Sequence, residues 1–273
     1  MSGLGRVLRR VEAMSIRGTE HRWALIPPEM ARQARPQVAR VGDGLVTLMS
    51  GSDSLRLNRV IGLGHRGEAS ETVIDAIIGR YRSARVKRFT VLLGPGPQAA
   101  EIERWLVHRR FTRHGGYVLL LRDGRKPVMR AVTDLRVARA GRSHREAVVR
   151  ILGEAFAVPP GQRGWSLATA ADPAYQHFLA FAGRMPAAVG AVRVEDGLAW
   201  LGGAATRTRW RHRGAHGALI AARLRRAVRF GCRWAWSETV EPTPGRPGGS
   251  RRNLLRFGFE QACVKPIYLW SGE

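Results

Sequence analysis

The chain has 273 residues, 44% of them hydrophobic and 25% charged, with a formal net charge of +25 at pH 7. This composition excludes an intrinsically disordered chain, and the length is comfortable for two hydrophobic cores. Two cysteines, Cys232 and Cys263, lie far apart without metal-ligand spacing, which argues against a disulfide framework and a zinc site. We therefore expect a cytoplasmic protein of two domains that holds no metal.

The positive charge is carried by arginine and is spread along the chain, since lysine occurs only at Lys87, Lys126 and Lys265. A nucleic-acid-binding protein usually concentrates its basic residues in a patch or a tail. The arginine excess, together with abundant alanine and glycine, is more typical of genome composition. A nucleic-acid partner is therefore not expected, and a steep salt dependence of DNA binding would reveal one.

No apolar run reaches the length of a membrane-spanning helix, so no membrane association is expected. The elements at the start of the chain have only a weak sequence pattern. Residues 3–14 are predicted as an ordinary surface helix, and a basic amphipathic helix that touches a membrane is the alternative.

The first half then alternates strands and helices. Apolar periodicity predicts a helix over 69–83, a strand over 88–94, a proline-led helix over 95–111 and a strand over 116–121. The polar segment 123–130 interrupts this pattern and is the best candidate for a linker. We place the domain boundary there, with domains at 1–126 and 127–273.

The second half continues with a helix over 144–156 and three strand candidates with short connections, which favour antiparallel pairing. A helix with one apolar stripe follows, then a strand, a further helix and a last strand. These segments are 175–184, 187–196, 198–206, 215–230, 232–239, 250–259 and 265–270. The order predicts an α/β fold with a mixed sheet. Because the first half ends in the same order of elements, we interpret the chain as a duplicated fold.

The segment 209–220 carries the clearest chemical signal. It leaves a strand, turns through Gly214 and Gly217, and enters a helix whose first backbone N–H groups lack intrahelical partners. A pyrophosphate fits such a turn, and Arg211 and Arg213 add positive charge beside it. The alternative is a plain strand-to-helix turn whose glycines serve only geometry.

This segment resembles the acyl-CoA-binding motif of the GCN5-related N-acetyltransferase (GNAT) superfamily, Q/R-x-x-G-x-G/A followed by a helix. Arg211, Gly214 and the run Ala218-Leu219-Ile220 match it, whereas His216 stands where the motif has a small residue. Residues 250–259 resemble the closing S-x-x-N…G-F helix of the superfamily; the alternative is a helix capped by Ser250 and ended by Gly258.

The resemblance implies two GNAT-like domains in tandem, each a mixed, mostly antiparallel sheet with splayed parallel central strands flanked by helices. It implies that acetyl-CoA lies between strands 198–206 and 233–239. The cofactor-binding residues that it implies are Ala205, Thr206, Arg211, Arg213, Gly214, Ala215, His216, Gly217, Ala218, Ser250 and Asn253.

Catalytic residues are less clearly marked. Many members of the superfamily carry a tyrosine that acts as general acid at the position where this chain has Leu254. Glu238, at the end of a predicted splayed strand, is the candidate for general base or amine-orienting group, and a surface carboxylate is the alternative. Tyr268 is a second candidate, as the acid, although strand tyrosines more often serve packing.

The first half resembles a degenerate copy of the same fold. Where the phosphate turn would stand, residues 62–75 lack the motif and place Glu68 and Glu71 where they would repel a pyrophosphate. We therefore expect no CoA there. The whole chain is expected to transfer an acetyl group from acetyl-CoA to a primary amine of a small molecule or peptide. A CoA-binding regulator without turnover is the alternative. The acceptor and the oligomeric state stay open.

Overall fold

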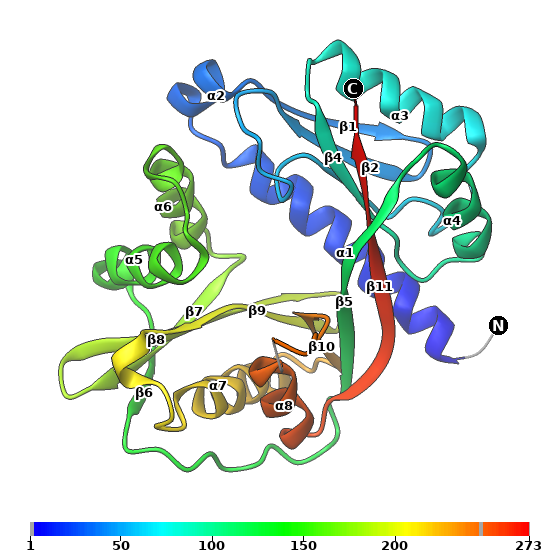
Figure 1. Cartoon of the computed structure of the whole chain (residues 1–273). Helices are drawn as coiled ribbons and strands as arrows, with labels where there is room; N and C mark the ends of the chain where they lie inside the picture. Colours follow the sequence, from blue (N-terminus) through cyan, green and yellow to red (C-terminus); the bar gives the residue numbers. More distant parts are fainter. Residues whose placement is uncertain (1–2, 246–247, 273) are drawn as a thin grey trace. The chain divides into compact units, whose positions relative to one another are not determined.

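The computed structural model describes residues 3–245 and 248–272 (Figure 1). The chain forms two compact units, one of Met1–Tyr117 with Cys263–Glu273 and one of Val118–Ala262. We call them unit 1 and unit 2. None of the helices in the described part of the chain is long and apolar enough to cross a membrane.

Unit 1 contains a mixed sheet with the strand order β1-β2-β3-β4-β11. Its elements are α1 (Gly3–Ala24), α2 (Pro28–Ala34), β1 (Pro36–Val41), β2 (Gly44–Met49), β3 (Arg59–Ile61), α3 (Glu71–Ser83), β4 (Arg88–Leu92), α4 (Ala99–His108), the first half of β5 (Thr112–Asp123) and most of β11 (Glu260–Ser271). Strands β3 and β4 are parallel, and the other pairs that join these strands are antiparallel.

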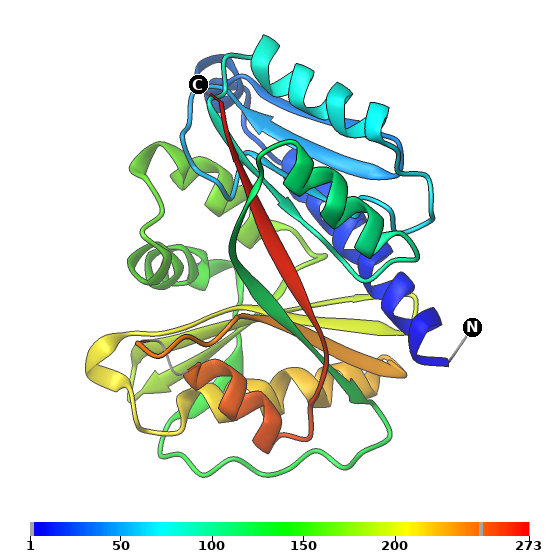
Figure 2. The same ribbon diagram turned by 45° about the vertical axis from the view of Figure 1, so that its right-hand side comes forward.

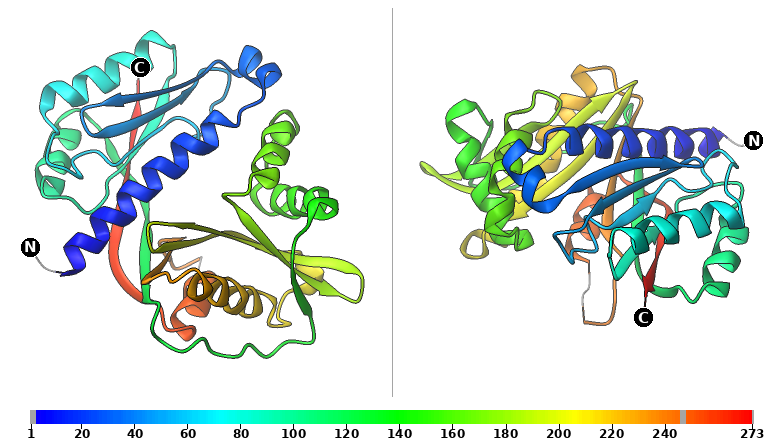
Figure 3. Two further views of the ribbon diagram at one scale, coloured as in Figure 1. Left: turned by 180° about the vertical axis from the view of Figure 1, so that it is seen from behind. Right: turned by 90° about the horizontal axis from the view of Figure 1, so that it is seen from above.

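Helices pack against apolar residues on both faces of this sheet. Val46, Val60 and Val91 face α3 and α4, where they meet Ile77 and Leu106. On the opposite face, Leu45, Ile61 and Leu92 pack against Ile16 of α1. Figure 3 shows α1 on one side of the strands and α3 with α4 on the other. The sheet of unit 1 is therefore covered on both faces.

Unit 2 contains the strand order β5-β10-β9-β8-β7-β6. Its elements are the second half of β5, β6 (Arg136–Arg139), α5 (Arg145–Phe156), α6 (Arg163–Ala171), β7 (Gln176–Ala182), β8 (Met185–Glu195), β9 (Leu198–Thr206), α7 (Ala215–Arg229), β10 (Trp234–Val240) and α8 (Gly249–Arg256). Strands β6 to β9 pair antiparallel, as the short connections predict, and β9 pairs with β10 in parallel.

The helices of unit 2 also lie on both faces of its sheet. Ala199, Leu201 and Ala235 pack against Ile220 and Leu224 of α7. Val189 and Leu179 pack against Ile151 of α5 on the other face. Figures 1 and 2 show α5 and α6 on one side of the strands and α7 and α8 on the other.

The two units repeat one order of elements: antiparallel strands, a strand, a helix, a second strand parallel to the first, and another helix. In unit 1 these last four are β3, α3, β4 and α4, and in unit 2 they are β9, α7, β10 and α8. The predicted α/β class, mixed sheets and duplicated fold are confirmed.

Three features of the sequence interpretation differ from the structure. The units divide within β5 and again within β11, so residues 263–273 belong to unit 1 and not to the second unit. The segment 123–130 is no free linker, because the buried guanidinium of Arg122 donates to the carbonyls of Lys126 and Pro127 at 2.8 and 2.9 Å. The first helix is longer than predicted: it extends to Ala24 and buries Val11 on one face, while Leu4 and Arg10 are exposed.

Candidate functional site

The parallel strands β9 and β10 separate soon after they start. They pair only from Leu198 to Trp200 on β9 and from Trp234 to Trp236 on β10. Next, the hydroxyl of Ser237 donates to the carbonyl of Leu201 at 2.7 Å. Both strands continue without further pairing to each other, β9 to Thr206 and β10 to Val240. The result is a gap between two strand ends.

A bulge in β9 accompanies this separation. Ala191 of β8 pairs with Gly202, but Val189 pairs with Ala205, so Gly203 and Ala204 together oppose one residue of β8. Gly203 has a φ of +51°, a conformation that glycine adopts without strain. From the bulge onward, Ala204, Ala205 and Thr206 of β9 line a cavity.

The turn that follows β9 leads into α7 through Gly214, whose φ is +72°. A Cβ at Gly214 would lie 2.0 Å from the carbonyl oxygen of Val132, so no side chain fits there. The first bond of the helix runs from the N–H of Ala218 to the carbonyl of Gly214 at 3.0 Å. No side chain in the described ranges caps this helix. The preceding N–H groups are therefore available to an anion.

Helix α8 closes the other side of the cavity with Ser250 and Asn253. The amide Nδ2 of Asn253 lies 3.1 Å from Nδ1 of His216 on α7, so the two sequence motifs are in direct contact. Burial and the nearby guanidinium of Arg223 lower the pKa of His216 to about 4. The ring is thus neutral at pH 7, Asn253 donates to its Nδ1, and its proton sits on Nε2.

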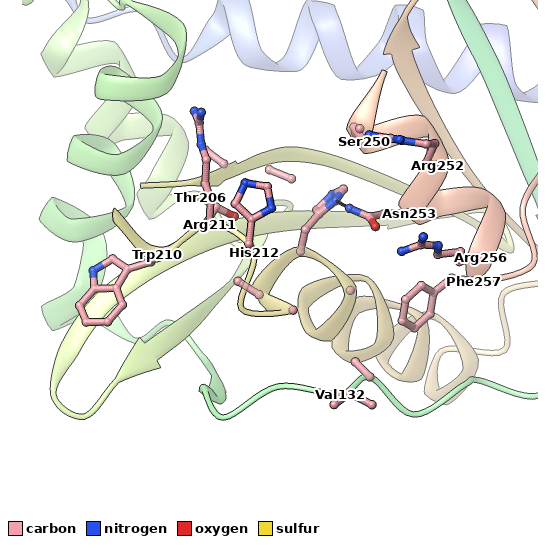
Figure 4. A pocket seen from close by; sticks show the side chains of 18 of the residues that line it. Val132, Thr206, Trp210, Arg211, His212, Ser250, Arg252, Asn253, Arg256 and Phe257 are labelled. Atoms are coloured by element: carbon pink, nitrogen blue, oxygen red, sulfur yellow. Dashed lines mark hydrogen bonds between the residues drawn. The ribbon is translucent and has the colours of Figure 1, made fainter. Parts of the chain in front are cut away.

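The cavity has a volume of about 1100 Å³ and lies wholly within unit 2 (Figure 4). It runs along the splayed end of β9, the α7 turn and the start of α8, with one wall formed by residues 129–132. Its lining includes Ala205, Thr206, Arg211, Gly214, Ala215, His216, Gly217, Ser250 and Asn253, all of which the sequence had indicated.

Arginines surround this cavity. Arg130, Arg211, Arg252 and Arg256 line it and are exposed. None of these four has an ion-pair partner among the residues that the structure describes. Uncompensated guanidinium groups beside free helix N–H groups favour a ligand with phosphate groups. The apolar stretch at Ala204 and Ala205 suits an uncharged arm of the same ligand.

Four of the sequence candidates do not line the cavity. Arg213 pairs with Asp134 and lies over the ring of Trp210. Ala218 is buried beneath the turn. Glu238 lies on β10, past the last residue that pairs with β9, and is partly exposed.

Tyr268 belongs to unit 1 and is 2% exposed. Its hydroxyl donates to Glu103 of α4. The structure therefore gives no support to Tyr268 as the general acid of this cavity, because its proton is engaged in another unit by a carboxylate.

The corresponding region of unit 1 is filled by its own residues. The buried carboxylate of Asp43 accepts from the backbone N–H groups of Gly64 and Arg66 at 2.6 and 2.8 Å. A Cβ at Gly62, where β3 ends, would lie 2.4 Å from Ile16 of α1. An internal carboxyl group and a helix thus occupy the places that are open in unit 2. Glu71, which was expected to repel a pyrophosphate, pairs with Arg109 at 2.9 Å.

Sequence reasoning missed part of the cavity wall. Residues 129–132, Trp210, Arg252, Arg256 and Phe257 line it without having been singled out. Arg252 and Arg256 lie on the motif helix at a spacing of four, which places them on one face and was a readable signal. The wall at 129–132 gave no signal, because these residues are irregular in structure and belong to neither motif.

No protein-family model and no curated protein matches the chain. Solved structures do match it. A GCN5-related N-acetyltransferase from Kribbella flavida has a TM-score of 0.67 at 18% identity, with 98% of this chain and 96% of that chain covered.

A GCN5-related N-acetyltransferase from Sphaerobacter thermophilus has a TM-score of 0.62 at 14% identity, covering 85% of this chain and 82% of that chain. A tandem GNAT protein from the clavulanic acid biosynthesis pathway has a TM-score of 0.58 at 15% identity, covering 85% of this chain and 79% of that chain.

Proposed function

We propose that this chain, which has the tandem GCN5-related N-acetyltransferase fold, transfers an acyl group from acyl-CoA to a primary amine in unit 2. The donor that we favour is acetyl-CoA. The observation that carries the proposal is the cavity along the splayed end of β9, where an apolar wall leads to an uncapped helix turn surrounded by arginines.

The parts of acyl-CoA correspond to the parts of this cavity. The N–H groups at Ala215, His216 and Gly217, with Arg211 beside them, would bind the pyrophosphate. Asn253 holds His216 so that its Nε2–H can donate as well. The pantetheine arm would lie along Ala205 in the gap between β9 and β10, with its acyl group toward the point where the strands part.

Direct transfer requires a neutral amine, donors for the tetrahedral oxyanion and a proton for the departing thiolate. Leu254 stands at the position of the usual tyrosine acid and is 2% exposed in the core, so no group there supplies that proton. We propose Glu238 as the base or amine-orienting group, because it lies at the end of the second splayed strand.

The apolar Leu254 also favours a second candidate function, a protein that binds acyl-CoA as a signal and does not turn it over. Binding alone does not separate the two candidates. Release of free thiol in the presence of an amine does, because only the enzyme consumes the thioester.

Binding is tested by isothermal titration of acetyl-CoA into the wild type and an Arg211→Ala, Arg256→Ala variant. Both arginines line the cavity, so we expect roughly a tenfold or greater loss of affinity. The control is Arg225→Ala, Arg229→Ala, which removes the same charge from exposed positions of α7 outside the cavity. Equal losses in both variants would show a non-specific charge effect and contradict the assignment.

Turnover is tested by thiol release from acetyl-CoA with a panel of primary amines. Glu238→Gln should lower kcat by about a hundredfold or more if Glu238 is the base. Tyr268→Phe should leave kcat within a factor of about two, since its hydroxyl bonds Glu103 in unit 1. Binding without thiol release from any amine would favour the regulator.

A further inference from the structure

Arg223 is a buried cation at the centre of α7. Its side chain is 1% exposed, and burial lowers its pKa to about 9, so it is charged at neutral pH. Nε donates to the carbonyl of Leu219, one turn back in the same helix, at 2.9 Å. Among the described residues it forms no ion pair with a carboxylate. A cation kept this far from water without a counter-charge needs another explanation.

The guanidinium reaches the bulge of β9. Nη1 donates to the carbonyls of Ala191 on β8 and Gly202 on β9, both at 3.2 Å. These two residues form the last regular pair before the bulge. One side chain of α7 therefore joins both strands at the point where β9 leaves its regular register.

The sequence of both strands leaves room for this contact. A Cβ at Gly190, opposite the bulge, would lie 2.8 Å from Cζ of Arg223. A Cβ at Gly202 would lie 1.8 Å from the indole of Trp200. The guanidinium of Arg223 thus packs against Gly190, and the indole of Trp200 packs against Gly202. Only glycine fits at these two positions.

We infer that Arg223 is a positioning residue: its guanidinium fixes the bulge of β9 and thereby the alignment of Ala204–Thr206 along the cavity. The functional consequence, alignment of the cavity wall for acyl-CoA, rests on the proposed function. The structural claim, that Arg223 fixes the bulge, does not. Through the bulge, Arg223 acts on the pantetheine side of the cavity, whereas the phosphate side has its own arginines and helix N–H groups. Its charge also acts on His216, so a test of the bulge must keep that charge in place.

The structural part is tested without any ligand, by amide hydrogen exchange. Arg223→Met removes the donors, and Gly190→Ala keeps Arg223 but pushes its guanidinium from the two carbonyls. Both variants should speed exchange within residues 202–206 by roughly tenfold or more, and not elsewhere in the sheet. Arg225→Met, at an exposed position of the same helix, is the control.

No change at 202–206, or an equal acceleration across the whole of unit 2, would overturn the inference. Because Gly190→Ala retains the buried charge, it covers the case in which Arg223→Met fails to fold. The hydrogen-exchange results of the two variants do not depend on whether the protein binds acyl-CoA.

The functional part is tested with two probes, acetyl-CoA and adenosine 3′-phosphate 5′-diphosphate, which has the 3′-phosphate and the pyrophosphate of CoA but no pantetheine arm. Gly190→Ala, which keeps the charge of Arg223 near His216, should weaken acetyl-CoA by roughly tenfold to a hundredfold and leave adenosine 3′-phosphate 5′-diphosphate within about twofold. Parallel losses for both probes would show a general structural role and contradict positioning. If the wild type binds neither probe, the proposed function fails, while the exchange result still decides the role of Arg223 at the bulge.

Discussion

His177 lies in β7 of unit 2, where it is 7% exposed. Burial lowers its pKa from 6.5 to about 4. Between these two values the unfolded chain binds a proton that the folded chain does not, so the free energy of unfolding rises with pH in this window. The contribution of His177 is intact above pH 6.5 and is lost as the pH falls toward 4.

We therefore expect the free energy of unfolding to fall on acidification by an amount on the order of 3 kcal/mol for this one histidine. Urea denaturation of the wild type and of His177→Gln, at several pH values from 7 to 4, measures the difference. The glutamine variant should show a shallower loss. Identical pH profiles would mean that the ring of His177 is not buried in its neutral form.

Gly214 offers a second test at the level of one residue. Its φ of +72° and the carbonyl of Val132, 2.0 Å from any added Cβ, both exclude a side chain. Gly214→Ala should destabilise unit 2 by about 2 kcal/mol or more. Gly153→Ala, on α5 with nothing within 4 Å of an added Cβ, should instead stabilise it by about 0.5 to 1 kcal/mol. Thermal unfolding of the two variants checks both signs.

The sequence indicated much of the cavity at this scale because its motif residues are consecutive in the chain. Gly214 to Gly217 form one turn, and Ser250 and Asn253 form another. Arg213 was assigned to the ligand but pairs with Asp134, a partner distant in the chain that periodicity does not identify. The direct contact between His216 and Asn253 was equally hidden, since it joins two separate helices.

At the scale of elements, the loop from β3 to α3 is held by a carboxylate of its own unit. Asp43 is 2% exposed and accepts from three backbone N–H groups of this loop, those of Gly64, Arg66 and Glu68. Helix α3 is also capped, because the hydroxyl of Ser70 accepts from the N–H of Val73. The backbone N–H groups of Gly64, Arg66, Glu68 and Val73 thus have acceptors within unit 1.

Asp43→Ala should destabilise unit 1 by about 3 kcal/mol or more, because it leaves buried N–H groups without acceptors. The affinity of unit 2 for acetyl-CoA should not change, since Asp43 lies outside its cavity. Denaturant titration and acetyl-CoA titration of the same variant give the two values. A variant of wild-type stability would show that water replaces the carboxylate at no net loss.

The predicted elements were those with a clear period. The helix over 69–83 corresponds to α3 (Glu71–Ser83), and the helix over 215–230 corresponds to α7 (Ala215–Arg229). Strands β1 and β2 were not predicted. Strand β2 is buried at all six positions and so shows no alternation between apolar and polar residues. The direction and splay of β9 and β10 followed from the family resemblance and not from periodicity.

At the scale of the whole molecule, unit 1 is closed by residues from both ends of the chain. Nζ of Lys265 on β11 lies 2.8 Å from Oε2 of Glu12 on α1, and both side chains are 1% exposed. The residues of β11 from Ile267 to Ser271 pair with β4. The domain boundary could not be placed from the sequence, because β5 and β11 are continuous strands that each contribute to two units.

Breaking this buried pair should have a large effect. Lys265→Met leaves the carboxylate of Glu12 buried without its cation, and we expect a loss of about 3 to 5 kcal/mol in the free energy of unfolding. Glu12→Gln, Lys265→Met should recover part of that loss, because no buried charge remains. Urea denaturation of both variants tests this order of stabilities, and a double variant less stable than Lys265→Met would contradict it.

The closure of unit 1 by residues 263–271 also has a consequence for biosynthesis. A ribosome releases the chain from its N-terminal end, so β4 emerges long before the strand that pairs with it. Unit 2 is one continuous stretch, Val118–Ala262, and all of it has been made before β11 is finished. We therefore expect unit 1, although most of it is translated first, to complete its folding last. Until β11 pairs with it, β4 has an open edge that a chaperone must protect from aggregation.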